Sequence, residues 1–395
     1  MTTALVLVIV GSAIVFYILV GYPILLAMWS KGSPAVVKDL RHQTTVSVIV
    51  SVYNGAAFIA AKLESILALD YPRELIEIIV VSDGSEDATD SIVSTFSSRG
   101  VRLVRVSHGG KAIALNSGLS HASGEILFFT DVRQPLESMA LRHLIANFAD
   151  PSVGAVTGEL HLLTGEDGEQ ADMDLYWRYE VWTRKRHTEI DSIFSTTGCI
   201  FAMRRSLAEP LPPDALIDDA VLTLGVFFRG YRVIFDPRAV AYDCPAIAGT
   251  EFRRRLRTLA GLWQVHARLP LFSASNRMRF HFLSHKFSRL VLPWAILLVF
   301  GASVALPASW FRTSVLDGEL CLIALALIDP LLGRRFPLKR LFSAARTFLM
   351  LNAAALTSII VFFVPPTKLW SPTRVQSKVI PSIKSQVIAP PRSRV

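Results

Sequence analysis

Hydrophobic and polar positions alternate along the middle of the chain so that strand-like and helix-like segments follow one another. Mostly apolar runs of strand length occupy residues 45–53, 76–82, 101–106 and 125–130. Segments with helical spacing lie between them, at 56–69, 87–98 and 111–122. In the first of these helices, Ile59, Leu63 and Ile66 fall on one face. This alternation predicts an α/β domain whose mainly parallel sheet has helices on both sides.

The pattern is less regular after Asp150. Further strands are predicted near 153–157, 199–203 and 231–236, and further helices near 172–187 and 216–229. We place the whole soluble domain at residues 43–245, which is an ordinary size for one domain.

Long apolar segments flank this domain. Residues 4–29 contain no charged side chain and are long enough to cross a bilayer. A secretory signal peptide is the alternative, but this run is too long and lacks both a basic start and a clear cleavage site. Three further candidate spans lie at 287–310, 317–333 and 342–364. The predicted layout is an N-terminal span within 1–30 and three helices within 286–365.

The weakest candidate span is 317–333, because it is short and contains Asp329 followed by Pro330. Asp329 is either an intramembrane polar site or a residue at a helix end near the interface, and we favour the helix end. Residues 366–395 are rich in Pro, Ser, Lys and Arg, which predicts a flexible basic tail.

Basic residues gather beside the predicted spans. The net charge is +9, and the cations that flank the spans are Lys31, Lys38, Arg41, Arg253, Arg254, Arg255 and Arg257. Because positive residues mark the cytoplasmic side, we expect the soluble domain in the cytoplasm and the protein in the plasma (inner) membrane. Three spans after the domain would place the basic tail outside, so either 317–333 does not cross or the tail departs from the rule. The clustering also argues against nucleic acid as the partner of this basic chain.

The region 250–285 begins with a basic amphipathic segment. Phe252, Leu256 and Trp263 recur at helical spacing, and arginines occupy the other faces. A helix of this kind lies on a membrane surface, so we expect an interfacial helix here.

Acidic residues stand at the ends of two predicted strands, where the second strand runs into Asp83 and the fourth into Asp131. Ligands of α/β sheets bind at the carboxyl ends of strands, so both carboxylates are expected at one site. Lys111 opens a helix after two glycines, where backbone N–H groups and the helix dipole favour anions. This combination indicates a nucleoside diphosphate with its cation, and Asp131 is suited to hold Mg²⁺ or Mn²⁺.

Each of these residues also has a simpler interpretation. The segment at Asp83 is a common turn that caps a helix, and Lys111 taken alone is an ordinary exposed lysine. Asp218 and Asp219 open a predicted helix. There they act either as favourable charges at a helix N-terminus or as a general base for an attacking hydroxyl.

Seven segments give these residues a common context when they are taken in order. They are SVIVSVYNG, EIIVVSDGS, GGKAIALNSG, EILFFTD, STTGCIFAMRR, LIDDAVL and RRRLRTLAGLWQ. This succession resembles the membrane-bound inverting glycosyltransferases of family 2, the relatives of cellulose, hyaluronan and poly-N-acetylglucosamine synthases. The resemblance covers about residues 43–265 and implies a GT-A-like nucleotide-sugar-binding fold flanked by transmembrane helices.

The resemblance assigns roles on the donor side. Asp83 matches the family aspartate that contacts the nucleotide, and Tyr53 and Lys111 lie where the family also touches it. Asp131 matches the first carboxylate of the family's DxD, which holds the metal bound to the diphosphate. Arg133 replaces the second carboxylate, which weakens the expected use of Mg²⁺ or Mn²⁺. If strand geometry persists, Arg133 reaches the pocket of Asp131, to pair with it or to hold diphosphate oxygens.

The family resemblance also assigns roles to residues on the acceptor side. Gly198 falls in the segment beside the acceptor, and Asp219 matches the catalytic base, with Asp218 in place of the family's Glu. Arg257 aligns with the arginine of the QxxRW region that neutralises the leaving diphosphate. Thr258 replaces the tryptophan of that region, which weakens any case for processive synthesis.

We therefore expect an inverting glycosyltransferase that moves a sugar from a nucleotide-sugar donor to a polysaccharide or lipid-linked acceptor at the lipid bilayer. No protein partner is inferred. A non-catalytic membrane protein that senses a nucleotide sugar is the alternative, and Arg133 is the feature that supports it. Release of nucleoside diphosphate separates the two, because a sensor binds without turnover.

Overall fold

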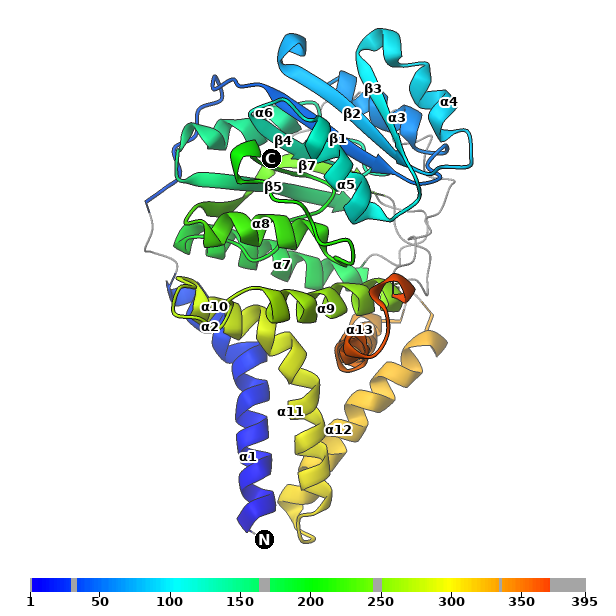
Figure 1. The fold of residues 1–395 in the computed structure, drawn as a ribbon. Coiled ribbons are helices and arrows are strands. Elements are labelled where there is room, and N and C mark those ends of the chain that lie inside the picture. Colours follow the sequence, from blue (N-terminus) through cyan, green and yellow to red (C-terminus); the bar gives the residue numbers. More distant parts are fainter. Residues whose placement is uncertain (1, 30–33, 163–170, 244–250, 334–335, 370–395) are drawn as a thin grey trace. The chain divides into compact units, whose positions relative to one another are not determined.

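The computed structural model describes residues 2–29, 34–162, 171–243, 251–333 and 336–369 (Figure 1). The chain divides into two units. The helical unit comprises residues 1–30, 167–183 and 248–373, and the sheet unit comprises residues 31–166 and 184–247.

The sheet unit is built on seven strands. They are β1 (Val46–Val52), β2 (Ile76–Asp83), β3 (Val101–Val106), β4 (Ile126–Phe129), β5 (Val153–Leu162), β6 (Phe201–Arg204) and β7 (Arg232–Asp243). Their order in the sheet is β3-β2-β1-β4-β6-β5-β7. Only β6 runs antiparallel to its neighbours, β4 and β5, and the other four pairings are parallel. The predicted α/β class with a mainly parallel sheet is therefore confirmed.

The predicted strands near 153–157 and 231–236 are too short. The pairing of β5 with β7 continues past these ranges after a shift in register. Thr157 pairs with Phe235, and the next paired residue of β5, Glu159, pairs with Val240. The irregularity leaves Asp236 and Pro237 outside the ladder, so the missing N–H of the proline breaks no strand pairing.

Five helices surround this sheet within its own unit. They are α3 (Ile59–Leu67), α4 (Thr89–Ser94), α5 (Lys111–His121), α6 (Ala140–Ile145) and α8 (Asp218–Phe228). Helix α6 was not predicted from the sequence, and its Leu141, Leu144 and Ile145 are all fully buried. Helix α5 packs on β1, β2 and β3, whereas α6 and α8 both pack on β5 and β7.

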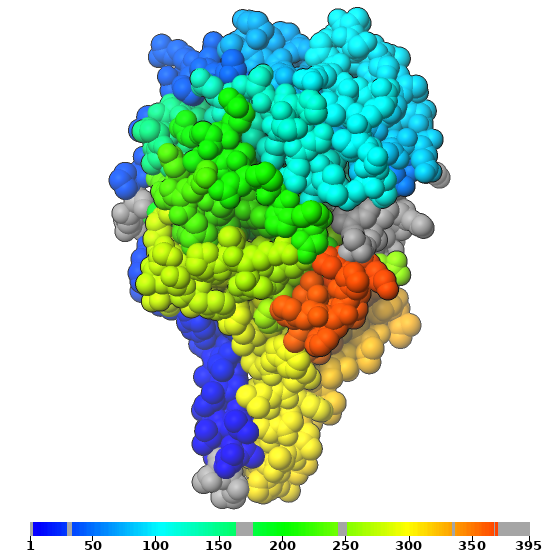
Figure 2. Space-filling model, in the orientation of Figure 1, coloured from blue at the N-terminus to red at the C-terminus, as the bar shows by residue number. Residues whose placement is uncertain are grey.

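The helical unit contains the remaining helices. They are α1 (Thr2–Phe16), a π-helical turn η1 (Tyr17–Gly21), α2 (Tyr22–Trp29), α9 (Glu251–Arg268), α10 (Arg279–Phe282), a π-helical turn η6 (Leu283–Phe287), α11 (Ser288–Val304), α12 (Trp310–Ile328) and α13 (Lys339–Thr357). Helix α7 (Ala171–Ile190) contributes its residues up to Thr183. Helices α1 and α11 lie side by side (Figures 1 and 2), where Val8 and Val299 share one buried cluster.

Among the described residues, three continuous helical stretches are long and apolar enough to cross a membrane. They are Thr3–Trp29, Arg279–Val304 and Lys339–Phe362. The predicted span at 317–333 corresponds to α12, whose first half carries Arg312, Asp317 and Glu319. Asp329 is the C-cap residue of α12 and accepts hydrogen bonds from Lys339 and Ser343. It therefore lies at a helix end, and its position near the membrane interface stays a prediction.

The predicted interfacial segment forms helix α9, which packs on α13 in the helical unit. The Nε1–H of Trp263 donates to Ser358 Oγ at 3.0 Å. Most of the predicted tail, from residue 370 onward, lies outside the described residues.

Candidate functional site

Asp83 organises the loop that precedes Lys111. Its side chain is almost fully buried at the end of β2 and accepts hydrogen bonds from the backbone N–H groups of Gly109 (2.8 Å) and Gly110 (3.0 Å). Gly110 has φ of +93°, a conformation that glycine adopts without strain. Gly110 is also the N-cap residue of α5, so the contact fixes the position from which Lys111 begins that helix.

Tyr53 lies beside this loop, stacked on His108. The two ring centroids are 4.2 Å apart, and His108 Nδ1 donates to the carbonyl oxygen of Asp83 at 3.0 Å. The Tyr53 side chain stays 39% exposed, which leaves it available to a planar ligand such as a nucleobase. From the sequence, His108 has the pattern of an ordinary surface polar residue, and its contacts with Tyr53 and Asp83 appear only in the fold.

Lys111 draws two acidic residues together. Its Nζ lies 2.9 Å from Asp131 Oδ1 and 3.1 Å from Asp218 Oδ2. Although burial disfavours the charged amine, these two carboxylates raise the pKa of Lys111 above its ordinary value. Residues from the start of α5, the end of β4 and the start of α8 therefore form one charged cluster.

Asp219 is next to this cluster in the first turn of α8. The N-cap position is held by Ile217, without a side-chain cap, so neither acid serves as the capping residue. Thr196 donates to Asp219 Oδ2 at 3.3 Å, and a Cβ placed on Gly198 would lie 3.6 Å from Asp219 Cγ. Burial and the neighbouring carboxylate of Asp218 raise the pKa of Asp219 to about 6. The carboxylate is therefore ionised at neutral pH yet basic enough to accept a proton.

Arg133 does not meet Asp131 in the way the sequence predicted. Strand β4 ends at Phe129, and the chain turns at Val132–Arg133, so residues two apart no longer point to one side. The guanidinium instead binds both carboxylate oxygens of Asp243, with Nε at 3.0 Å and Nη2 at 2.8 Å. Asp131 has Lys111 as its ionic partner instead. Asp243 was missed because the predicted strand near 231–236 stopped well before it.

Comparison with known proteins gives this arrangement its context. Residues 47–211 match the model of "Glycosyl transferase family 2". "Probable glycosyltransferase YdaM" of Bacillus subtilis (strain 168) is 29% identical over 224 residues, 52% of this chain and 52% of that protein. The poly-beta-1,6-N-acetyl-D-glucosamine synthase of Staphylococcus aureus (strain COL) is 24% identical over 62% of this chain and 61% of its own length. The matched region thus spans just over half the length of these relatives.

A solved structure extends the match to the whole fold. Mannosyltransferase PcManGT from Pyrobaculum calidifontis, in complex with GDP-Man and Mn²⁺, superposes with a TM-score of 0.72 at 26% identity. The superposition covers 90% of this chain and 97% of that one. Residues 47–211 thus match glycosyl transferase family 2. The GT-A-like fold predicted from the motif order is confirmed.

The acidic residues of the Lys111 cluster suit a hard divalent cation. Asp131 and Asp218 converge on the ammonium of Lys111, which shows that one cation reaches both carboxylates. Mg²⁺ and Mn²⁺ are bound through one or two carboxylates, with substrate phosphates and water completing the shell. In the described part of the chain, no group of three or more acidic, histidine or cysteine side chains is arranged to hold a metal ion.

Arg257 belongs to the helical unit, on α9, so the sheet unit by itself does not hold all the residues assigned from the family motif. Its role at the leaving diphosphate stays a prediction, as do the nucleotide contacts of Tyr53, Asp83 and Lys111.

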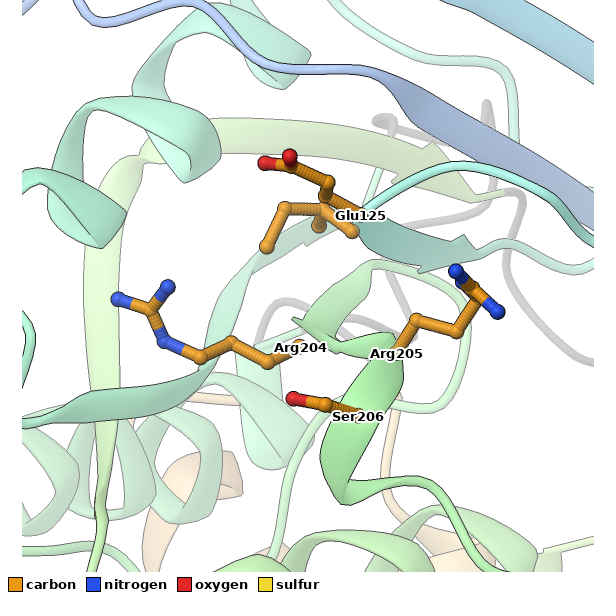
Figure 3. Close-up of a pocket in the computed structure, with 5 residues that line it drawn as sticks. Glu125, Arg204, Arg205 and Ser206 are labelled. Atoms are coloured by element: carbon orange, nitrogen blue, oxygen red, sulfur yellow. The ribbon is translucent and has the colours of Figure 1, made fainter.

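A cavity of about 410 Å³ lies at the opposite end of β4 from Asp131 (Figure 3). It is lined by Glu125, Ile126, Arg204, Arg205 and Ser206. The guanidinium of Arg204 is already held by the carbonyl oxygens of Val153, Phe148 and Asp150. None of the predicted site residues lines this cavity, and we assign it no part in the chemistry.

Proposed function

We propose that this protein is an inverting glycosyltransferase that uses a nucleotide-sugar donor. The observation that carries the proposal is the convergence of Asp131 and Asp218 on Lys111, beside Asp219, at the carboxyl ends of the parallel strands. The match of residues 47–211 to family 2 supports it, and so does the likeness to PcManGT, whose complex holds GDP-Man and Mn²⁺.

Asp219 is the proposed general base. It takes the proton from the acceptor hydroxyl while that oxygen attacks the sugar carbon opposite the leaving diphosphate, which inverts the configuration. Thr196 holds one carboxylate oxygen, and the small Gly198 leaves the adjoining space open for an acceptor. A base whose pKa is about 6 is matched to proton transfer near neutral pH.

The charge on the departing diphosphate is neutralised by fixed positive groups. We assign Lys111 and Arg257 to this task, with Asp131 and Asp218 as the residues that hold Mg²⁺ or Mn²⁺. The bound cation supplies charge neutralisation at the phosphate oxygens. Tyr53 is placed as the stacking surface for the base, and Asp83 as the residue that shapes the adjoining loop.

The acceptor is proposed to be a polysaccharide or a lipid-linked sugar at a membrane. The synthase relatives and the three helices long enough to span a bilayer support this assignment. The proposed location is the plasma (inner) membrane with the catalytic domain in the cytoplasm, because the basic residues stand beside the spans.

Release of nucleoside diphosphate from a panel of UDP- and GDP-sugars, GDP-mannose included, tests this function. Membranes that contain the wild-type protein are compared with membranes that contain Asp219→Asn at equal abundance. We expect at least one donor to be consumed with release on the order of 100-fold above the Asp219→Asn control. Donor binding without release from any donor would instead establish the nucleotide-sugar sensor. Arg133 was the feature that favoured a sensor, and it supports a sensor less strongly because its guanidinium binds Asp243 and does not neutralise Asp131.

A further inference from the structure

A buried lysine lies directly beneath the loop that carries Asp131. Lys62, in α3, is 1% exposed, and its ammonium donates to Thr130 Oγ1 and to the carbonyl oxygen of Gln134, both at 2.5 Å. These acceptors come one residue before Asp131 and three residues after it. One side chain therefore holds both ends of the turn on which the proposed metal ligand sits.

The same contacts extend to the acceptor side of the site. Thr130 Oγ1 donates onward to the carbonyl oxygen of Cys199 at 2.8 Å, and Cys199 directly follows Gly198. On the other side of the turn, the Gln134 side chain donates to Asp243 Oδ2 at 2.8 Å. Through Lys62, α3 thus connects the Asp131 turn with the segment proposed to face the acceptor.

The buried position of Lys62 is energetically unfavourable for a charged amine. Within the described residues, no carboxylate lies within ion-pair distance of Lys62, and both of its acceptors are uncharged. Burial of an amine without an opposite charge is unfavourable, and it lowers the pKa of Lys62 to about 7. Its helical neighbours Leu63 and Ile66 fill comparable buried positions with aliphatic side chains, so packing alone does not require a lysine here.

We propose that Lys62 is a positioning residue that fixes the Asp131 turn for divalent cation and diphosphate and couples this turn to the Gly198 segment. The inference rests on the proposed function, because it assigns cation binding to Asp131. It assigns to Lys62 no contact with substrate and no proton transfer.

The experiment compares the full-length wild-type protein, Lys62→Met and Leu63→Ala in detergent. Methionine keeps the apolar stem of Lys62 and removes its hydrogen bonds, whereas Leu63→Ala removes a buried side chain from the same helix and keeps the hydrogen bonds of Lys62 to the turn. Binding of Mn²⁺ alone is measured from the loss of the free-ion electron paramagnetic resonance signal, and melting temperatures report folding. We expect Lys62→Met to bind Mn²⁺ at least tenfold more weakly than the wild type, and Leu63→Ala to remain within twofold.

Thr130→Val supplies an independent measurement, because valine preserves the shape and removes the hydroxyl that links Lys62 to Cys199. We expect its Mn²⁺ affinity to fall, and the double variant to be no weaker than Lys62→Met, since both changes break one chain of contacts. Three outcomes overturn the inference. The Mn²⁺ affinity of Lys62→Met lies within twofold of that of the wild type, Leu63→Ala loses as much Mn²⁺ affinity as Lys62→Met, or the wild type binds no Mn²⁺. Diphosphate release is recorded separately, so its absence from a wild type that binds Mn²⁺ rejects the proposed function and leaves the test of Lys62 intact.

Discussion

Asp219 and Asp218 are consecutive in the sequence but differ in what surrounds them. The Asp218 carboxylate has the ammonium of Lys111 at 3.1 Å, which neutralises it. Asp219 has a threonine hydroxyl and a negatively charged neighbour, and it is partly withdrawn from water. Because Asp219 lacks the neutralising lysine that Asp218 has, we assign the role of proton acceptor to Asp219.

Asp219→Asn is expected to lower turnover by about 10²–10⁴-fold and to leave donor affinity nearly unchanged, because the amide keeps the shape and loses the base. Steady-state diphosphate release and equilibrium binding of the donor measure the two quantities. Turnover within a few-fold of the wild type would show that Asp219 only favours the start of α8.

The turnover of the wild type should depend on pH through Asp219. Its pKa of about 6 means that the active, ionised form dominates above pH 7 and is lost as the pH falls. At pH 5 we expect roughly a tenth of the plateau rate, since only about one molecule in eleven then carries an ionised base. A rate that stays flat down to pH 5 at saturating donor would contradict this assignment.

At the scale of elements, a largely buried ion pair joins the turn after β4 to the end of β7. The side chains of Arg133 and Asp243 are 18% and 4% exposed. Arg133→Ala would leave the carboxylate buried without its guanidinium, so we expect the free energy of unfolding of the sheet unit to fall by about 3 kcal/mol. Denaturant titration measures the loss, and Arg102→Ala, on the exposed side of β3, is the control. A change below 0.5 kcal/mol in Arg133→Ala, as is usual for surface sites, would show that the pair contributes little.

Helix α5 lies so close to the sheet that one position admits only glycine. A Cβ on Gly118 would come within 2.6 Å of Ile49 Cγ2. Gly118→Ala should therefore destabilise the protein by about 1–3 kcal/mol through overpacking. In contrast, Gly225→Ala in α8 meets no atom within 4 Å and should be neutral or stabilising by about 1 kcal/mol, from helix propensity. Equal effects of the two substitutions would refute the packing argument.

At the scale of the whole molecule, the proposed topology puts the sheet unit in the cytoplasm and the connection between α11 and α12 outside. Single cysteines at the exposed positions Ser91 and Ser309 test both sides, in a background without the native cysteines. An impermeant reagent applied to intact cells should label Ser309→Cys and spare Ser91→Cys until the membrane is permeabilised. The reverse pattern would invert the topology. A third cysteine at Ser377 reports the side of the C-terminal tail.

The sequence alone determined the features that depend on neighbouring residues. Apolar periodicity located the main strands and helices of the sheet unit. Apolar runs located the three helical stretches that are long enough to cross a membrane, together with a fourth candidate at 317–333. Strand-end positions also predicted that Asp131 would lie near the segment that carries Lys111, because parallel strands deliver their carboxyl ends to one edge of the sheet. The contact of Asp218 with Lys111 was not predicted.

The tertiary structure decided which side chains meet across the chain. The partner of Arg133 depended on where β4 ends and how far β7 extends, and neither boundary is marked by local pattern. Lys62 reads as an ordinary lysine on a helix, and only the fold brings it beneath a turn 68 residues further along. Local periodicity specifies elements and faces, whereas partner choice depends on packing between segments remote in sequence, which no local pattern encodes.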